Sequence, residues 1–164
     1  MCFSFKFQPI VPRFNNKMTI HTTFLAKQRV TKQIPHNVTY LSLRNLTTYM
    51  NDNNNIYGVF EYRPTKYMFG STNYGEIPNI FNRADDCGWD IIAPGYEKLE
   101  IEKEKKISSI YNVLILQNGN HKVVVKLENE NNYCAKKAAQ EMQLFSKTYY
   151  KHTRVRCKWL YRIN

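Results

Sequence analysis

Three carboxylates and a cysteine surround a short turn near the middle of the chain. Asp85 and Asp86 precede the turn at Cys87-Gly88, and Asp90 follows it. Carboxylate oxygens are the ligands that a hard cation such as Mg²⁺ prefers, whereas a thiol is a soft ligand that prefers zinc or copper. Carboxylates beside a turn can also cap it by accepting backbone N–H bonds. The segment is therefore either a metal-binding loop or a capped turn.

The elements that must position these residues are predicted as five strands and one helix. Alternating or β-rich runs indicate strands over residues 38–43, 56–62 and 89–93. Two further runs, 111–117 and 121–127, flank Asn118-Gly119 and predict a hairpin. The charged residues 97–106 indicate a solvated loop or edge. Small and apolar residues recur at helical spacing from Ala135 to Tyr149, which predicts a helix of about four turns.

Strands followed by one late helix indicate the α+β class, with the helix packed on a small antiparallel barrel or curled sheet. A chain of 164 residues with 43% hydrophobic residues fits one domain with an adequate core. Pro9, Pro12 and Pro35, together with scattered cations, predict an extended basic arm over residues 1–35. The domain then covers residues 36–164.

The segment from Asn73 resembles the signature of a known enzyme family. Asn73-Tyr-Gly-Glu-Ile-Pro, followed by acids at Asp85 and Asp90, is similar to N-Y-G-x-I-P and D-G-D-P-x-D-V of the soluble family I inorganic pyrophosphatases. The resemblance implies a five-stranded, OB-like barrel, homo-oligomers, and magnesium-dependent hydrolysis of pyrophosphate to phosphate. It runs in order from Val38 to Trp159 and is most specific from Asn73 to Ile92.

The resemblance also implies roles for single residues. Asp85 and Asp90 match acids that bind magnesium, and Tyr74 matches a tyrosine near the attacking water. Tyr74, Asp90 and Cys87 are thus the candidate catalytic residues, with Cys87 standing where the family has an acid. The implied phosphate-binding residues are Arg63, Lys122, Tyr150 and Lys151.

The departures from the family concentrate on the acids. Cys87 replaces one carboxylate, and the turn at Asn118-Gly-Asn-His lacks two metal-binding aspartates of the family. Upstream, Thr48-Tyr49-Met50 supplies no acid where the family has one. Because Mg²⁺ relies on carboxylates and substrate phosphates, these replacements put hydrolysis in doubt. Two alternatives stay open: a non-catalytic basic barrel that binds phosphate groups or nucleic acid, and a structural or assembly protein.

The net charge of +11 is unevenly distributed along the chain. Residues 1–51 contain seven Lys or Arg and no acid, and residues 107–164 contain ten basic and three acidic residues. The acids are concentrated in residues 52–106. A basic arm and a basic C-terminal tail around an acidic centre favour a polyanionic partner such as a polyphosphate or nucleic acid. A solvated basic surface with no specific partner is the alternative.

The cysteines and the apolar runs bear on the cellular compartment. Cys2, Cys87, Cys134 and Cys157 form no C-x-x-C pair and no recognisable disulfide framework, which favours a reducing compartment. Neither a signal peptide nor a membrane-spanning run is predicted. We therefore expect a soluble cytoplasmic protein without a membrane partner. Abundant Asn, Lys, Ile and Tyr indicate an AT-rich genome, such as that of a large DNA virus or a protist.

Overall fold

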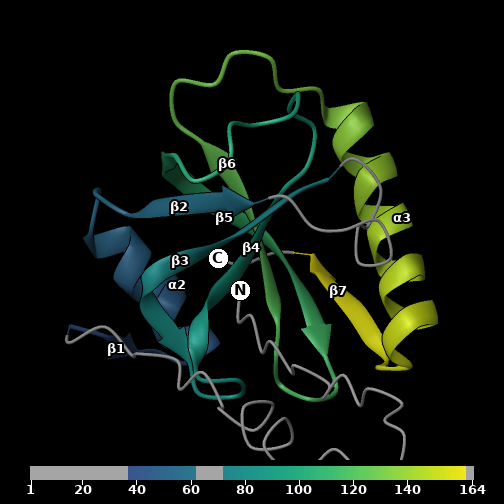
Figure 1. Cartoon of the computed structure of the whole chain (residues 1–164), viewed down its shortest axis with the longest axis horizontal. Coiled ribbons are helices and arrows are strands. Elements are labelled where there is room, and N and C mark those ends of the chain that lie inside the picture. Colours follow the sequence, from purple (N-terminus) through teal and green to yellow (C-terminus); the bar gives the residue numbers. More distant parts are fainter. Residues whose placement is uncertain (1–36, 62–71, 162–164) are drawn as a thin grey trace, which may run out of the picture. The chain divides into compact units, whose positions relative to one another are not determined.

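Seven strands form one sheet in the computed structural model, which describes residues 37–61 and 72–161 (Figure 1). The strands are β1 (Thr39–Tyr40), β2 (Tyr57–Glu61), β3 (Asn73–Asn82), β4 (Cys87–Ala93), β5 (Glu104–Leu116), β6 (Lys122–Leu127) and β7 (Cys157–Tyr161). The helices are α2 (Leu43–Asp52) and α3 (Ala135–Thr153). The predicted arm and Arg63 lie outside the described residues.

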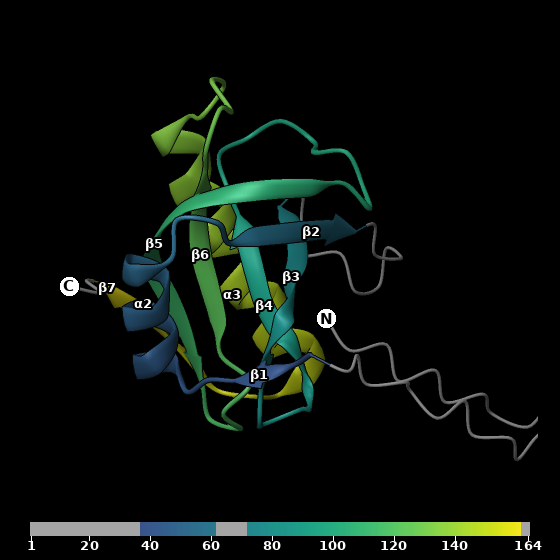
Figure 2. The ribbon, with the colours of Figure 1, turned by 90° about the vertical axis from the view of Figure 1, so that its left-hand side faces the viewer.

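Five of these strands close into a barrel. Their order is β3-β2-β5-β6-β4, and β4 pairs back onto β3. The neighbours are antiparallel except for β4 and β6, which are parallel. Outside the ring, β1 runs parallel to part of β3 and β7 runs antiparallel to β5 (Figure 2). The prediction of an α+β protein with a five-stranded barrel and a C-terminal helix is confirmed at this level.

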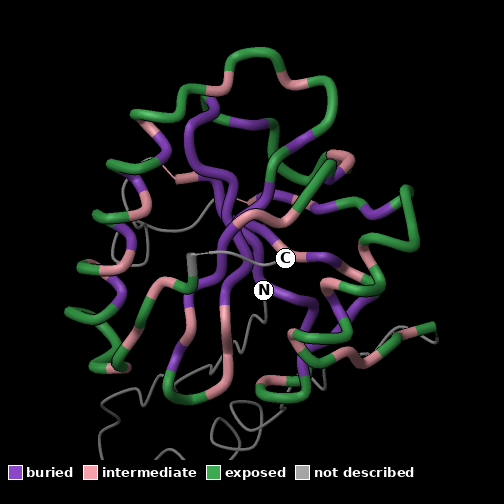
Figure 3. Tube along the Cα trace, turned by 180° about the vertical axis from the view of Figure 1, so that it is seen from behind, coloured by how far each residue is buried: buried purple, intermediate pink, exposed green. Residues whose placement is uncertain are grey.

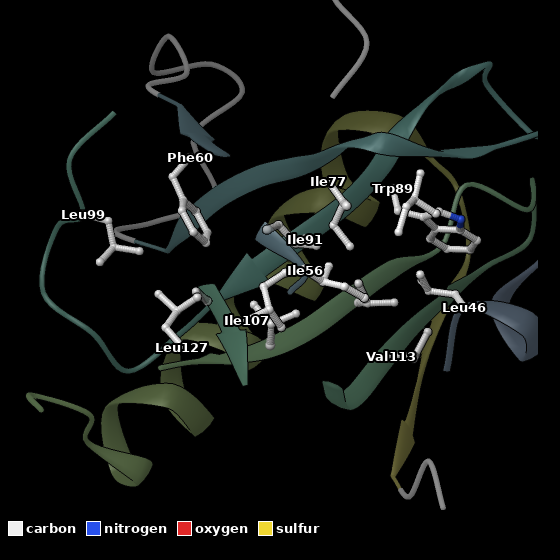
Figure 4. Packing of buried hydrophobic residues seen from close by; sticks show 14 of the residues in the cluster. Leu46, Ile56, Phe60, Ile77, Trp89, Ile91, Leu99, Ile107, Val113 and Leu127 are labelled. Carbon is white, nitrogen blue, oxygen red and sulfur yellow. The ribbon is translucent and has the colours of Figure 1, made fainter. Parts of the chain in front are cut away.

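The main apolar core is inside the barrel because side chains alternate between the two faces of each strand. Trp89 and Ile91 on β4 point inward and are almost fully buried (Figure 4). Val123 and Val125 on β6 belong to the same cluster and are fully buried. Leu46 of α2 is fully buried in the same cluster. Each such side chain contributes about 1.5–3 kcal/mol through removal of its surface from water. The core therefore fixes which face of β4 points outward.

The second apolar cluster lies between the outer face of the barrel and α3. It joins Phe145 and Tyr149 of α3 to Ile92, Leu114 and Val124 of the strands. One side of α3 is accordingly buried and the other exposed along its length (Figure 3). The predicted helix is confirmed and extends to Thr153, where Arg154 ends it in a left-handed conformation.

The predicted strand over residues 38–43 is wrong in its second half. Only Thr39–Tyr40 forms a strand, and α2 begins at Leu43. The reason is local: the Ser42 hydroxyl accepts a hydrogen bond of 3.2 Å from the Asn45 backbone N–H, which caps the helix. Alternation over so few residues did not reveal this cap.

The predicted hairpin is confirmed, but its turn is wider than two residues. The last ladder pair joins Leu114 to Lys122. Beyond it, Gly119 has a φ of +81° and donates a backbone hydrogen bond to the Leu116 carbonyl, while His121 Nδ1 accepts from the Leu116 N–H at 3.0 Å. The His121 imidazole thus accepts the hydrogen bond from the Leu116 N–H that a backbone carbonyl of the neighbouring strand would otherwise accept.

The sequence patterns predicted neither β3, which is part of the barrel, nor β7. Only part of the charged stretch is irregular, since β5 already begins at Glu104. No helix among the described residues is long and apolar enough to cross a membrane.

Candidate functional site

The outer face of the barrel brings Asp90 and Lys122 together. Asp90 points outward because its neighbours Trp89 and Ile91 occupy the core. The parallel pairing of β4 and β6 aligns Ile91 with Val123, so the residues just before them are neighbours. Lys122 Nζ forms an ion pair with Asp90 Oδ2, and each side chain is only 3% exposed. The pair is therefore shielded from solvent on the side where the resemblance places a phosphate ligand.

Aromatic rings enclose the Lys122 ammonium. Its Nζ lies 5.8 Å from the ring centroid of Tyr74 on β3 and 5.8 Å from that of Tyr149 on α3. Phe145 lies between the two tyrosines, with ring centroids 6.0 Å from each. A cation this close to ring faces is attracted by their quadrupoles. Lys122 is thus held by one carboxylate and two tyrosines under α3.

Asp85 belongs to the same electrostatic group. It lies in the turn between β3 and β4, where its Oδ1 accepts a hydrogen bond of 3.2 Å from the Cys87 N–H. Burial and the negative charge of Asp90 raise the pKa of Asp85, and the positive charge of Lys122 partly opposes this. The structure therefore brings Tyr74, Asp90 and Lys122 together, and Asp85 lies near enough for the charges of Asp90 and Lys122 to act on it.

Glu76 is a further acid on this face that the sequence analysis did not select. It stands opposite Asp90 in the β3–β4 ladder. Its carboxylate lies over Gly88, because a Cβ added there would be 3.0 Å from Glu76 Oε2. The signal was present in the sequence, since Glu76 lies two residues after Tyr74 and alternation puts both on one face.

Cys87 is fully buried and disulfide-bonded, whereas Cys134 and Cys157 are free thiols. The disulfide differs from the expectation that the cysteines form none. The Cys87 Sγ lies 3.2 Å from the Asp85 carbonyl oxygen. A sulfur is a soft ligand, so Cys87 does not supply the hard oxygen that the family acid provides for Mg²⁺.

The phosphate-binding pair predicted on α3 is not part of this site. Tyr150 is 46% exposed and Lys151 is exposed, whereas Tyr149 is the tyrosine that contacts Lys122. Tyr149 was predicted as part of the apolar stripe of the helix. The tyrosine in the site is therefore identified by the face of α3 on which it lies, and not by its place in the order of the family motifs.

The enclosed arrangement does not fit a hydrated magnesium ion. Mg²⁺ keeps several waters and needs open, near-octahedral coordination. Asp90 instead binds an ammonium beneath aromatic rings. Among residues 37–61 and 72–161, no group of three or more His, Cys, Asp or Glu residues is placed to hold a metal ion. A surface cavity of about 470 Å³ is lined by loop residues from Lys98 to Lys103 and includes none of the site residues.

A second feature is a run of exposed cations at the end of the chain. We call residues 147–158 the cationic segment; it covers the last turns of α3, the connection and the start of β7. Its cations are all exposed: Lys147, Lys151, Arg154, Arg156 and Lys158. No acid follows Glu141 in the sequence. Other lysines pair with acids, for example Lys105 with Glu130 at 2.7 Å.

No protein-family model, curated protein or solved structure matches this chain.

Proposed function

We propose that this chain is a non-catalytic barrel of the inorganic pyrophosphatase type that binds phosphate-rich polyanions through the cationic segment. The observation that carries the proposal is a contrast between two groups of cations. Lys122 is neutralised by Asp90 and covered by α3, whereas the five cations of the cationic segment are exposed and have no acid near them in the sequence.

The placement of four residues supports the pyrophosphatase type, including its OB-like barrel. Asp85 lies in a turn, Asp90 on the following strand, and Lys122 on the second arm of a hairpin, and these elements come together with Tyr74. This is the order and the grouping that the resemblance implies. The barrel and the positions of these four residues therefore both support the pyrophosphatase type, whether or not the protein is active.

The closed ion pair argues for loss of hydrolysis. A catalytic cation must stabilise charge that develops on the phosphoryl oxygens in the transition state. Lys122 already interacts with Asp90, and a phosphate would have to displace that carboxylate and enter beneath Tyr149. Separating a buried pair leaves an uncompensated charge, which costs about 3–5 kcal/mol.

The cationic segment has the properties of a polyanion-binding surface. Exposed lysine and arginine side chains displace condensed counterions from a phosphate chain, and this release drives binding. Nucleic acid and inorganic polyphosphate share the required chemistry, which is a row of closely spaced phosphates. Ion pairs with acids of the same chain would weaken the binding of phosphates, and the cationic segment contains no acid.

The test is binding of fluorescent oligothymidylate and of labelled inorganic polyphosphate as a function of salt. A variant with Lys147, Lys151, Arg156 and Lys158 replaced by Gln is expected to lose affinity for both ligands. Its log K should also fall less steeply with log salt, by about 0.7 for each phosphate that the variant no longer neutralises.

The matched control replaces four lysines that form ion pairs elsewhere, Lys103, Lys105, Lys106 and Lys137, by Gln. It removes the same net charge but keeps the cationic segment. If both variants bind equally well, affinity follows net charge alone and the proposed site is wrong.

Residual hydrolysis is the second candidate, and the grouping of Tyr74, Asp85, Asp90 and Lys122 favours it. Magnesium belongs to this alternative. Phosphate release from pyrophosphate with Mg²⁺ or Mn²⁺ is expected at background for both the wild type and Asp90→Asn. Release by the wild type that Asp90→Asn abolishes, with the fold of the variant intact by circular dichroism, would establish a hydrolase instead.

A further inference from the structure

Tyr150 lies among the cations of the cationic segment and projects into solvent. Three cations of α3 and its end, Lys147, Lys151 and Arg154, follow each other at spacings of four and three residues, which puts them on one face of the helix. Tyr150 is three residues after Lys147 and four before Arg154, so it borders the same face. The backbone N–H of Arg154 donates to the Tyr150 carbonyl at 2.8 Å, which keeps this spacing helical to its end.

The packing of the barrel does not require the Tyr150 ring. Phe145 and Tyr149 are buried in the outer cluster, at 0% and 9% exposure, while Tyr150, about 100° from Tyr149 around the helix, is 46% exposed. Among the described residues it also has no aromatic or cation–π partner. A large apolar ring is thus presented to solvent between positive charges.

We propose that the polyanion is single-stranded nucleic acid, with a base stacked on Tyr150 and neighbouring phosphates held by Lys147, Lys151 and Arg154. The inference rests on the proposed polyanion binding and deepens it. Aromatic platforms beside a cationic track are the means by which proteins bind single strands without sequence preference. A duplex hides the faces of its bases, and inorganic polyphosphate has no bases, so neither ligand can use the ring.

The spacing of the cations suits such a strand. At 1.5 Å rise per residue, Lys147 and Lys151 are about 6 Å apart along the helix axis and Lys147 and Arg154 about 10 Å. Flexible side chains of this length can reach successive phosphates of an extended strand. Arg156 and Lys158 continue the positive charge into β7.

The experiment compares Tyr150→Ala with wild type on two ligands, oligothymidylate and inorganic polyphosphate, at one salt concentration. The variant is expected to bind oligothymidylate about fivefold or more weakly, which corresponds to removal of one stacked base. Its affinity for polyphosphate should not change. Tyr150→Phe keeps the ring and should bind both ligands like wild type. Tyr49→Ala, which removes an exposed tyrosine from α2, is the matched control.

Each alternative has its own result. Equal affinity of Tyr150→Ala and wild type for oligothymidylate would overturn the stacking proposal, although polyanion binding would stand if the Gln variant of the cationic segment is still impaired. Duplex DNA or polyglutamate bound as tightly as the single strand would also overturn it. Absence of binding to any polyanion at low salt would instead refute the proposed function itself.

Discussion

Lys122 and Asp90 are residue types that suit the binding of phosphate and metal ions, yet here they form an ion pair with each other. Transfer of two charges into a protein interior is unfavourable unless they are paired and well hydrogen-bonded. The chain pairs the two charges with each other, and two tyrosine rings lie near the ammonium. The same contacts that allow these charges to be buried make Lys122 inaccessible to a ligand.

Replacement of Lys122 by Met should destabilise the protein strongly. Met keeps most of the side-chain volume but leaves the Asp90 carboxylate buried without its ammonium, so we expect a decrease of about 3–5 kcal/mol in the free energy of unfolding. Urea denaturation followed by tryptophan fluorescence measures it.

The double variant Lys122→Met/Asp90→Leu is the control for this experiment. Removing both charges together eliminates the desolvation cost, so the double variant should recover most of the stability that Lys122→Met removes. A decrease below about 1 kcal/mol in Lys122→Met would contradict the buried pair, since that is the range of exposed ion pairs.

The raised pKa of Asp85 predicts a pH-dependent stability. The folded state holds the proton of Asp85 more tightly than the unfolded chain does, because of burial and the nearby Asp90 charge. The stabilisation from this proton is therefore complete below the ordinary pKa of 3.8 and is lost as pH rises through the folded value.

Asp85→Asn tests this effect, because Asn keeps an oxygen for the Cys87 N–H but cannot ionise. The unfolding free energy of the variant should decline less than that of the wild type between about pH 4 and pH 7. Parallel curves for the two proteins over that range would contradict it.

The residues of the site were predictable to the extent that strands fix them. Alternation along β4 places Asp90 on a definite face, whereas Tyr74 and Lys122 came from the family order, since no strand was predicted over β3. The order of motifs selected Tyr150, whereas the ring near Lys122 is that of Tyr149. Adjacent helical residues point about 100° apart, and the order of motifs does not resolve that difference. The burial of Lys122 depends on long-range packing by α3, which no local pattern encodes.

At the scale of elements, the hairpin and α3 could be predicted because each has a strong local pattern. β7 has such a pattern too, since Val155, Cys157 and Trp159 alternate with exposed residues and pack against the outer cluster. The cations Arg156 and Lys158 between these residues made the sequence resemble a polar tail. Helix α2 was missed because a single capping residue, Ser42, decides between helix and strand there.

The start of α3 can be improved by one substitution. Its N-cap, Cys134, has the extended backbone that a capping residue requires, with φ −122° and ψ 112°, but its side chain makes no capping hydrogen bond. A hydroxyl accepts from the free helix N–H groups far better than a thiol does. Cys134→Ser should therefore raise the free energy of unfolding by about 0.5–1 kcal/mol.

Thermal or urea unfolding of Cys134→Ser checks this, with Cys134→Ala as the control that removes the thiol without adding an acceptor. Since Cys134 is exposed, its replacement leaves the core intact. A Ser variant no more stable than the Ala variant would show that this helix end gains nothing from a cap.

At the scale of the whole molecule, charge is divided unevenly between the barrel and the rest of the chain. The described residues contain all 13 acids of the chain. The cations outside them are Lys6, Arg13, Lys17, Lys27, Arg29, Lys32, Arg63, Lys66 and Arg162, and no acid accompanies these. Of the 24 cations, 15 are left in the described residues against 13 acids, so this part of the chain is close to neutral. Long-range attraction of a polyanion therefore depends largely on the cations outside it.

This division predicts that the N-terminal cations add to the salt dependence of binding without changing base stacking. In a variant of the full chain with Gln at the six cations before residue 36, log K for oligothymidylate should fall with log salt less steeply. The slope should decrease by up to about four, at 0.7 per neutralised phosphate. The decrease in affinity caused by Tyr150→Ala should be the same in this background, because stacking and counterion release are separate contributions. Titrations at several salt concentrations measure both quantities. An unchanged slope would mean that the cationic segment alone contacts the strand and that the N-terminal charges lie outside the bound interface.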